Sequence, residues 1–345
     1  MKFLKVIIPV TIILSILFID YYNKYYKDNT SFKDESIFLY IISNDSVSFT
    51  DSISKYIKSE KTFYRVAERL GYLDNIKTGR FKINKGIGNK ELVTSLKFNN
   101  TPLTITFNNQ ERVENLAGRI SKQIYADSTA LINSFTDKDF LVENKFNKEN
   151  ILSIFIPNSY EVYWDIEPDK FRDKMLLEYE KFWNKSRTEK AKNIGLTKKE
   201  VTSLASIVQK ESVKVDERPT IAGVYINRLN TRMRLQADPT VIYSIKDYYK
   251  NFDTIIRRVL YRDLRLNSRY NTYRINGLPP GPISMPDISA IDAVLNYEKH
   301  KFIFFVADPS IEVIIFLLGT YLNTIEIKKS TLDGLTVEEY IDSLV

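Results

Sequence analysis

The chain has 345 residues, no cysteine, one histidine and a formal net charge of +7 at pH 7. This length allows two domains and a sizeable core. The absence of cysteine excludes disulfides and thiolate chemistry, and the single histidine excludes a multi-histidine zinc site. A Ser–His–Asp triad would have to use His300, which we expect at a surface or a helix end. The basic residues are scattered among Asp and Glu, which is typical of solvated helix faces and disfavours a nucleic-acid-binding surface.

The chain begins with an apolar segment, Phe3–Ile19, interrupted by few polar residues. It is slightly shorter than the roughly 20 residues that cross a bilayer. Lys5 can extend to the interface, and Tyr21 and Tyr22 follow at the other end, which closes the gap. A cleaved signal peptide is the alternative, but no small-x-small cleavage site follows the segment. We therefore expect residues 1–22 to be an uncleaved, single-pass anchor in the plasma membrane. Its N-terminus would be cytoplasmic and the rest of the chain would lie on the outer (periplasmic) side.

The next part of the chain predicts a tether and a small α+β module. Residues 23–35 are polar and charged, which favours a short tether. Residues 36–108 alternate strand-like and helix-like patterns. The expected strands are Ser36–Phe49, Gly79–Ile83 and Leu103–Phe107, and the expected helices are Ile53–Leu70 and Asn89–Leu96.

Residues 109–345 predict a second, mainly helical domain with a small sheet, so that the overall fold class is α+β. The expected helices include Glu111–Ile124, Ser128–Phe135, Phe171–Trp183, Ile221–Leu229 and Ile288–Leu295, and Phe302–Ala307 is expected to be a strand. The segment Ile154–Trp164 is rich in aromatic residues, which could stack on sugar rings or simply pack in the core.

One helix of this domain carries the strongest chemical signal. Thr197 and Glu200 fit a capping box, and apolar residues follow at helical spacing up to Val208. Glu211 continues that apolar stripe three residues later. Burial disfavours an ionised carboxyl and raises its pKa, and a carboxyl that is protonated near neutral pH suits a general acid. The alternative is a helix-end glutamate that reaches solvent or pairs with Lys210 or Arg218.

Two loops are expected beside this helix. Asp238 precedes a proline, which disfavours continued helix and predicts a loop over RLQADPT, with a short helix from Val241. Gly277–Pro286 contains four prolines and two glycines in ten residues and predicts a rigid loop. A rigid loop beside a helical acid is a suitable wall for a binding site.

The amino-acid sequences of these segments resemble those of a known family. The strings ASIVQKES, ERPTIAGVYINRL, MRLQADPTVIY and YNTYRINGLPPGPISMP are similar to those of the MltG (YceG-like) endolytic murein transglycosylases, over about 110 residues with nearly the same spacing. The string TGRFKI…GNKELVTSLKFNN resembles the LysM-like N-terminal module of that family. Residues 109–345 would then be the YceG-like catalytic domain.

The resemblance implies cleavage of the β-1,4 bond between N-acetylmuramic acid and N-acetylglucosamine, which leaves a 1,6-anhydromuramic end. Glu211 matches the catalytic glutamate of the family. Asp238 would orient or support it electrostatically, unless it only caps a turn. Amide or phenol groups in the matched motifs are expected to contact sugars, although each alone could equally brace a loop: Asn227, Gln236, Asn271 and Tyr273. No metal or organic cofactor is implied. Wall synthases (penicillin-binding proteins) are the expected partners.

The resemblance stops after Ser310. The family continues with a Gly-His-x-Phe strand and a Glu-His-Asn helix, whereas this chain continues IEVIIFLLGTYLNTIEIKK. Codons exist for Ile311–Lys328 that, read two bases later, spell RGYHIFARNLFEHNRNK, which contains the missing motifs in order. We therefore hypothesise a one-base insertion or deletion near Ser310, and we expect residues 310–330 to pack poorly. A capping box from Thr336 to Glu339 predicts a last helix.

Two other classes of function are consistent with parts of the sequence. A catalytically impaired scaffold that binds peptidoglycan would suit the anchor, the LysM-like module and the altered C-terminal region, but it leaves the intact motif around Glu211 unexplained. A nucleic-acid-binding protein would suit the net charge, but it has no motif and conflicts with the anchor.

Overall fold

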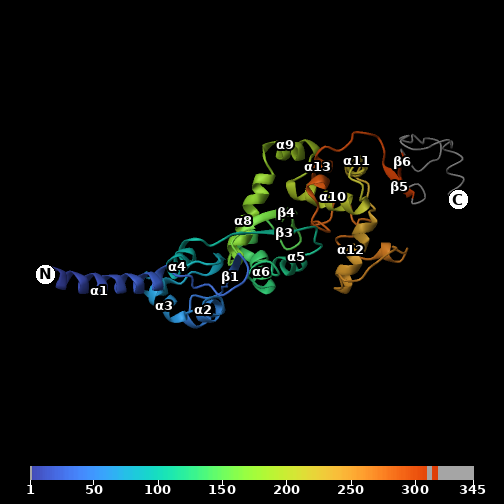
Figure 1. Ribbon diagram of the computed structural model, residues 1–345. Coiled ribbons are helices and arrows are strands. Elements are labelled where there is room, and N and C mark those ends of the chain that lie inside the picture. The colour runs from blue at the N-terminus through green and yellow to red at the C-terminus, as the bar shows by residue number, and fades with distance from the viewer. Residues whose placement is uncertain (1, 309–312, 318–345) are drawn as a thin grey trace. The chain divides into compact units, whose positions relative to one another are not determined.

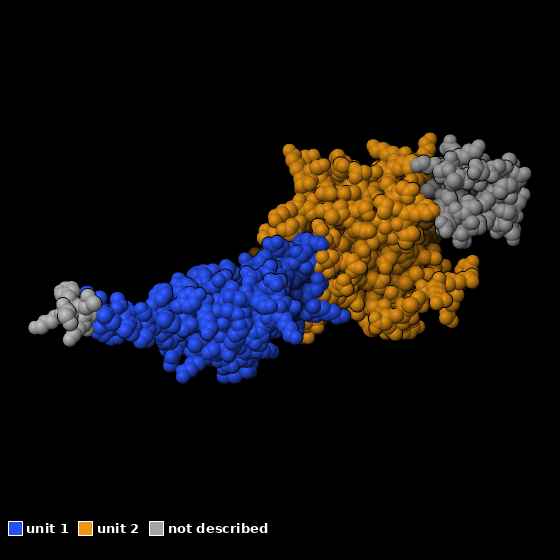
Figure 2. Space-filling model, viewed as in Figure 1, with its two compact units in different colours: residues 1–105, 120–127, 159–168 blue, residues 106–119, 128–158, 169–345 orange. Residues whose placement is uncertain are grey.

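The computed structural model describes residues 2–308 and 313–317 (Figure 1). The chain forms two compact units (Figure 2). Unit 1 comprises residues 1–105, 120–127 and 159–168, and unit 2 comprises residues 106–119, 128–158 and 169–345. The chain passes between the two units several times. The expected domain boundary at residue 108 stays a prediction.

The chain starts with helix α1 (Lys2–Tyr25). Its segment Ile7–Tyr25 is long and apolar enough to cross a membrane, and it is not buried inside the protein. The helix therefore continues past residue 22, the expected end of the anchor. Part of the expected tether is packed rather than free: Asn29 and Thr30 are buried, and the Asn29 side chain donates a hydrogen bond to Asn89 Oδ1 at 2.6 Å.

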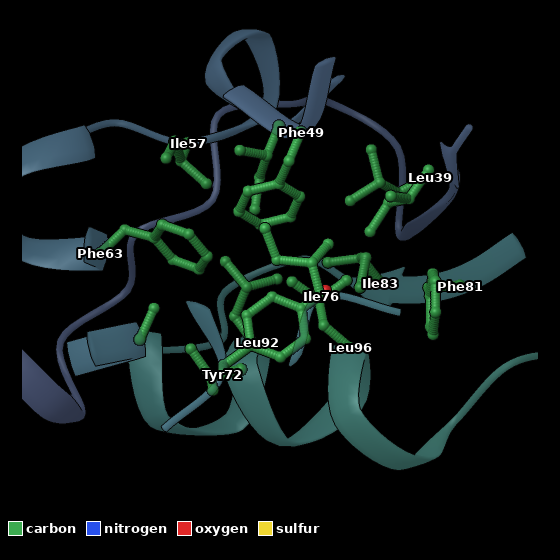
Figure 3. Close-up of a cluster of buried hydrophobic side chains, with 14 of the residues drawn as sticks. Leu39, Phe49, Ile57, Phe63, Tyr72, Ile76, Phe81, Ile83, Leu92 and Leu96 are labelled. Atoms are coloured by element: carbon green, nitrogen blue, oxygen red, sulfur yellow. The ribbon is translucent and has the colours of Figure 1, made fainter. Parts of the chain in front are cut away.

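Unit 1 has an antiparallel pair of strands, β1 (Ser36–Ile41) and β2 (Gly79–Asn84), in which Ser36 pairs with Asn84 and Ile41 with Gly79. Its helices are α2 (Ser46–Ile53), η1 (Ser54–Tyr56), α3 (Glu60–Arg69), η2 (Leu73–Asn75) and α4 (Asn89–Phe98). Inward-facing residues of these elements form one apolar core that includes Phe49, Phe63, Tyr72 and Leu92 (Figure 3). Burial of such side chains is the main stabilising contribution to the unit.

Two expected boundaries in unit 1 were wrong. The expected strand Ser36–Phe49 ends at Ile41, because the Asp45 side chain accepts hydrogen bonds from the first backbone N–H groups of α2 and starts a helix there. The expected helix Ile53–Leu70 is broken, and α3 begins only after Ser59, which caps it. Local capping decided both boundaries. The interpretation of residues 36–108 as LysM-like stays a prediction.

A second two-stranded sheet pairs β3 (Leu103–Phe107) with β4 (Asn158–Val162). The remaining elements are α5 (Val113–Ile120), α6 (Ser128–Phe135), α7 (Lys138–Glu143), η3 (Ile151–Ile154), α8 (Pro168–Phe182), α9 (Lys185–Ile194), α10 (Lys198–Glu211), α11 (Arg218–Asn230), α12 (Asp238–Tyr249), η4 (Asp263–Arg265) and α13 (Ile288–Leu295). The expected helices Ser128–Phe135 and Ile288–Leu295 are confirmed with the same bounds.

Helix α10 lies at the centre of unit 2 and packs against α11, α12 and α13. Its side chains also hold the loop that follows Gly277. Ser206 Oγ accepts a hydrogen bond from the Ile283 backbone N–H at 3.0 Å, and Gln209 Oε1 accepts one from the Asp287 N–H at 2.6 Å. The loop is therefore fixed to the same helix that ends at Glu211, as a rigid wall beside a site requires.

The segment after α13 lies close to α11 at Gly223. A β-carbon at this position would lie 2.4 Å from the Glu298 carbonyl oxygen and 2.5 Å from His300 Nε2. Only glycine therefore allows the segment after α13 to lie against α11. His300 is fixed in this contact, since its Nε2 lies 2.9 Å from the Thr220 carbonyl oxygen and its Nδ1 accepts the Phe302 N–H at 3.0 Å.

The last described elements are β5 (Phe304–Asp308) and β6 (Val313–Leu317), which pair antiparallel. Strand β5 begins two residues later than the strand expected from Phe302. Within the range 310–330, in which we expected poor packing, residues 313–317 form β6, and the others lie outside the described residues. The last helix expected from Thr336 also lies outside them.

Candidate active site

Glu211 is the last residue of α10. The helix begins with the expected capping box, in which Thr197 and Glu200 satisfy each other's backbone N–H groups. Buried apolar residues then continue up to Val208. This pattern carries Glu211 to the C-terminal end of the helix, where the negative end of the helix dipole disfavours an ionised carboxyl.

Glu211 is half-buried, and its carboxyl lies against the buried Tyr225. Burial raises the pKa of this carboxyl to about 7; a hydrogen bond from Tyr225 opposes this shift, the charge of Asp238 adds to it, and Arg228 opposes it weakly. The Tyr225 hydroxyl donates the hydrogen bond to Glu211 Oε1 at 2.6 Å. A carboxyl with a pKa raised into the neutral range can both donate and accept a proton.

Sequence reasoning missed Tyr225. It lies in α11, is 1% exposed, and packs edge-on against Phe305 at 5.8 Å between ring centroids. Burial and the neighbouring Glu211 charge raise its pKa well above the usual value, so it stays a hydrogen-bond donor. The sequence did contain a signal for it, a tyrosine within an apolar helix. A buried tyrosine hydroxyl usually has a hydrogen-bond partner, so a polar group was to be expected beside it.

Arg228 is the second residue of α11 that sequence reasoning did not select. Its Nε donates to the Ile303 carbonyl at 2.6 Å and its guanidinium lies over the Phe304 ring. Burial lowers its pKa, while the nearby Tyr225, Tyr273 and Glu211 act in the opposite direction. A fixed guanidinium here supplies positive charge near the Glu211 carboxylate.

Asp238 opens α12 and does not lie in a loop. The expectation of a loop over RLQADPT was wrong at its end, because Pro239 lies in the first turn of a helix, where its missing N–H has no cost. Asp238 is exposed, and its Oδ1 accepts a hydrogen bond from the Tyr273 hydroxyl at 2.7 Å. Its charge raises the pKa of Glu211, so Glu211, Asp238 and Tyr273 form one electrostatic group.

The three expected amide contacts behave differently. The Asn227 side chain donates to the carbonyls of His300 and Phe302 at 2.8 and 2.9 Å. Asn271 is 0% exposed, and its amide donates to two backbone carbonyls of the preceding loop. Both amides brace loops, which is the alternative that the sequence left open. Gln236 is exposed and has a positive φ of 49°, directly before the start of α12.

The described residues thus bring together one carboxyl with a raised pKa, a second carboxyl, a buried phenol and a fixed guanidinium. No group of three or more His, Cys, Asp and Glu side chains is placed to hold a metal ion within the described part of the chain. Such a site can protonate a leaving group and stabilise the positive charge that develops as the bond breaks. The fold and the site define a mixed helix-and-strand protein in which one carboxyl, that of Glu211, is placed to act as an acid.

Comparison with known proteins places this architecture in a family. The YceG-like family model matches residues 47–316, and the chain belongs to that family. It is similar to an endolytic murein transglycosylase of Bacillus subtilis (strain 168), with 29% identity over 297 residues and 79% of each chain covered. It is also similar to one of Streptococcus pneumoniae, with 34% identity over 153 residues that cover 44% of this chain and 27% of the relative.

A solved structure shares the fold. A YceG-like protein from Listeria monocytogenes superimposes with a TM-score of 0.55 at 23% sequence identity, covering 84% of this chain and 97% of the other.

Proposed function

We propose that the protein is an endolytic lytic transglycosylase. It would cleave the β-1,4 bond between N-acetylmuramic acid and N-acetylglucosamine within peptidoglycan strands and leave a 1,6-anhydromuramic end. One observation carries this proposal: the Glu211 carboxyl lies at the end of α10 and accepts a hydrogen bond from the buried Tyr225 hydroxyl at 2.6 Å. Burial in this position raises the pKa of the carboxyl to about 7. The names of the relatives in Bacillus and Streptococcus support peptidoglycan as the substrate.

Glu211 acts first as the acid. It donates its proton to the glycosidic oxygen as the bond from that oxygen to C1 of the muramic acid breaks. The sugar acquires oxocarbenium character, and Asp238, which accepts a hydrogen bond from the Tyr273 hydroxyl at 2.7 Å, stabilises this positive charge. Tyr225 and Arg228 stabilise the carboxylate that Glu211 becomes.

Glu211 then acts as the base. The C6 hydroxyl of the same muramic acid attacks C1, and the Glu211 carboxylate accepts the hydroxyl proton. The acid is regenerated and no water is consumed. Because the nucleophile belongs to the substrate, the reaction needs only one carboxyl for both proton transfers, whereas a hydrolytic enzyme needs a second carboxyl for water or for a covalent intermediate.

The exposed residues at the edge of the site are the proposed sugar contacts. Gln236 is exposed beside Asp238, and Tyr273 is partly exposed and already bound to it. Asn227 and Asn271 are positioning residues in this proposal, since their amides hold the loops on which the site is built.

We further propose that α1 anchors the chain in the plasma membrane. Its apolar segment Ile7–Tyr25 has the length for one crossing. The N-terminus would be cytoplasmic, and both units would lie on the outer side, where peptidoglycan and the wall synthases that extend it are found. Glycan-strand termination during wall assembly is the corresponding role.

The test is digestion of purified peptidoglycan by the full-length protein in detergent, with Glu211→Gln as the matched variant. Mass spectrometry of the products should show anhydromuramic ends with the parent and none with the variant. If the parent instead produced reducing muramic ends, the reaction would be hydrolysis and not transglycosylation. Binding without cleavage would favour the alternative, a scaffold that binds peptidoglycan.

The reading-frame hypothesis for residues 310–330 remains a proposal. The family match ends at residue 316, shortly after the point where the sequence changes character. Resequencing the gene across the codons of Ser310 and Lys328 tests it. An unaltered frame in independent reads would exclude a sequencing error, and a digestion assay on the frame-corrected chain would show whether activity depends on the altered segment.

A further inference from the structure

A second cavity in unit 2 has lining residues that the proposed chemistry does not use. It has a volume of about 430 Å³ and opens between the start of α5, the turn before η3, the second half of α12 and the loop before Tyr270. Its charged lining residues are Glu111, Arg112, Glu114, Lys148, Glu149, Asp247 and Arg269. The volume is in the range of sites for small organic ligands.

A smaller pocket links this cavity to α10 and α12, the helices that carry Glu211 and Asp238. The smaller pocket has a volume of about 160 Å³ and shares Glu111 and Tyr243 with the cavity. The walls of the smaller pocket include Lys210, which directly precedes Glu211 in the chain, and Pro239, which directly follows Asp238. A polymer bound across Glu211 could therefore place a branch in the larger cavity.

The junction of the two pockets is fixed by ion pairs. Glu111 accepts hydrogen bonds from Lys210 Nζ at 2.9 Å and from Lys246 Nζ at 2.8 Å. Burial alone would raise the pKa of Glu111, but these two ammonium groups outweigh it and hold the pKa below its usual value. The junction therefore stays ionised and rigid over the neutral pH range.

The ionic lining distinguishes this cavity from a site for bare sugar. Neutral pyranose rings are bound by amides, hydroxyls and open aromatic faces. Here Tyr270 is 8% exposed and its ring packs on Tyr243 at 4.5 Å between centroids, so these faces are covered by protein. The lining carries both cations and anions instead, and two of its residues, Arg269 and Glu149, form an ion pair at 2.9 Å.

We propose that this cavity binds the stem peptide of peptidoglycan, the short peptide that is attached to muramic acid and carries free carboxylates and an amino group. The inference rests on the proposed function, because it assigns the peptide part of the same substrate. Lys148 and Arg269 are the proposed contacts for peptide carboxylates, and Glu114 and Asp247 those for the amino group. Such a subsite positions the muramic acid through its own substituent and favours strands that still carry peptides.

The experiment compares two substrates and two double variants of the full-length protein. The substrates are uncrosslinked glycan strands with their stem peptides and the same strands after an amidase has removed the peptides. The test variant is Lys148→Ala with Arg269→Ala. The control variant is Lys138→Ala with Lys192→Ala, two exposed lysines of unit 2 that do not line the cavity and that give the same change in charge.

The test variant should raise KM for peptide-bearing strands about tenfold or more, which is the effect of losing one charged contact, and should leave KM for denuded strands unchanged. The control variant should change neither. An equal effect on both substrates, or no effect on peptide-bearing strands, would overturn the inference.

Calorimetry with a soluble muramyl tetrapeptide separates this inference from the proposed function, because it does not require cleavage. Binding by the parent that is lost in the test variant supports the subsite, even if neither substrate is cut and the proposed function fails. Cleavage by a parent that does not bind the muramyl tetrapeptide would overturn the subsite and leave the function standing.

Discussion

The hydrogen bond between Tyr225 and Glu211 sets the pH range of the proposed reaction. Tyr225→Phe removes one hydroxyl from a residue that is 1% exposed and leaves the ring in place. The lost bond, 2.6 Å long in the structure, stabilises the ionised carboxyl more than the protonated one. A hydrogen bond to a charged group contributes about 1.5–3 kcal/mol, and the protonated acid keeps no more than part of it.

The expected result is a higher pKa of Glu211 in the variant. A difference of about 1.4 kcal/mol between the two protonation states corresponds to about one pKa unit. The parent pKa of about 7 should therefore rise towards 8. Since the acid must be protonated to donate, the alkaline limb of the kcat/KM profile should move up by about one unit.

The assay is the release of anhydromuramic ends at a series of pH values from 5 to 10, with Tyr249→Phe as the matched control. Tyr249 is 71% exposed, so the same substitution there should leave the profile unchanged. An alkaline limb that stays in place or moves to lower pH in Tyr225→Phe would refute the assigned role of the phenol.

Three further predictions follow from the same geometry. Asp238→Asn removes a charge that raises the pKa of Glu211, so the alkaline limb should move down by roughly half a unit in the same assay, and an upward movement would contradict this. The pKa of Glu211 is raised on folding from 4.5 to about 7, so its stabilising contribution is complete below pH 4.5 and is lost as the pH rises through 7. Urea unfolding should therefore show that the free energy of unfolding of Glu211→Gln, relative to that of the parent, increases by up to about 3 kcal/mol from pH 5 to pH 9. The same difference between variant and parent at both pH values would count against this prediction. Gly223→Ala should lower the free energy of unfolding by about 1–3 kcal/mol, because its β-carbon would lie 2.4 Å from a carbonyl oxygen, whereas Gly118→Ala has open space and should be neutral or stabilising in the same urea titration.

Local signals in the sequence predicted much of the fold. The capping box at Thr197 and the apolar stripe that follows it located α10, and Ser128–Phe135 was found with its bounds. The errors also have local causes. The strand expected over Ser36–Phe49 ignored Asp45 as a helix cap, and Asp238 before Pro239 was interpreted as a break when it marks a helix start.

The candidate site was predictable only in part. Glu211 was identified from its position on an apolar stripe and from the resemblance of its motif, and the structure gives this carboxyl a raised pKa. Its partners Tyr225 and Arg228 were missed, because their proximity to Glu211 depends on how α10 and α11 pack against each other. The spacing of residues in a single sequence does not determine that packing. The amides of Asn227 and Asn271 have the residue type of sugar contacts, but tertiary contacts assign them to backbone carbonyls.

The most direct test of the central claim is a titration of the Glu211 carboxyl itself. Glutamate labelled with ¹³C at the side-chain carboxyl would be incorporated into the full-length protein, and Glu211→Gln would identify the resonance. The account predicts a midpoint at about pH 7. A midpoint near the ordinary glutamate value of about 4.3 would mean that Glu211 is ionised at neutral pH, and it would contradict the role of this residue as the general acid.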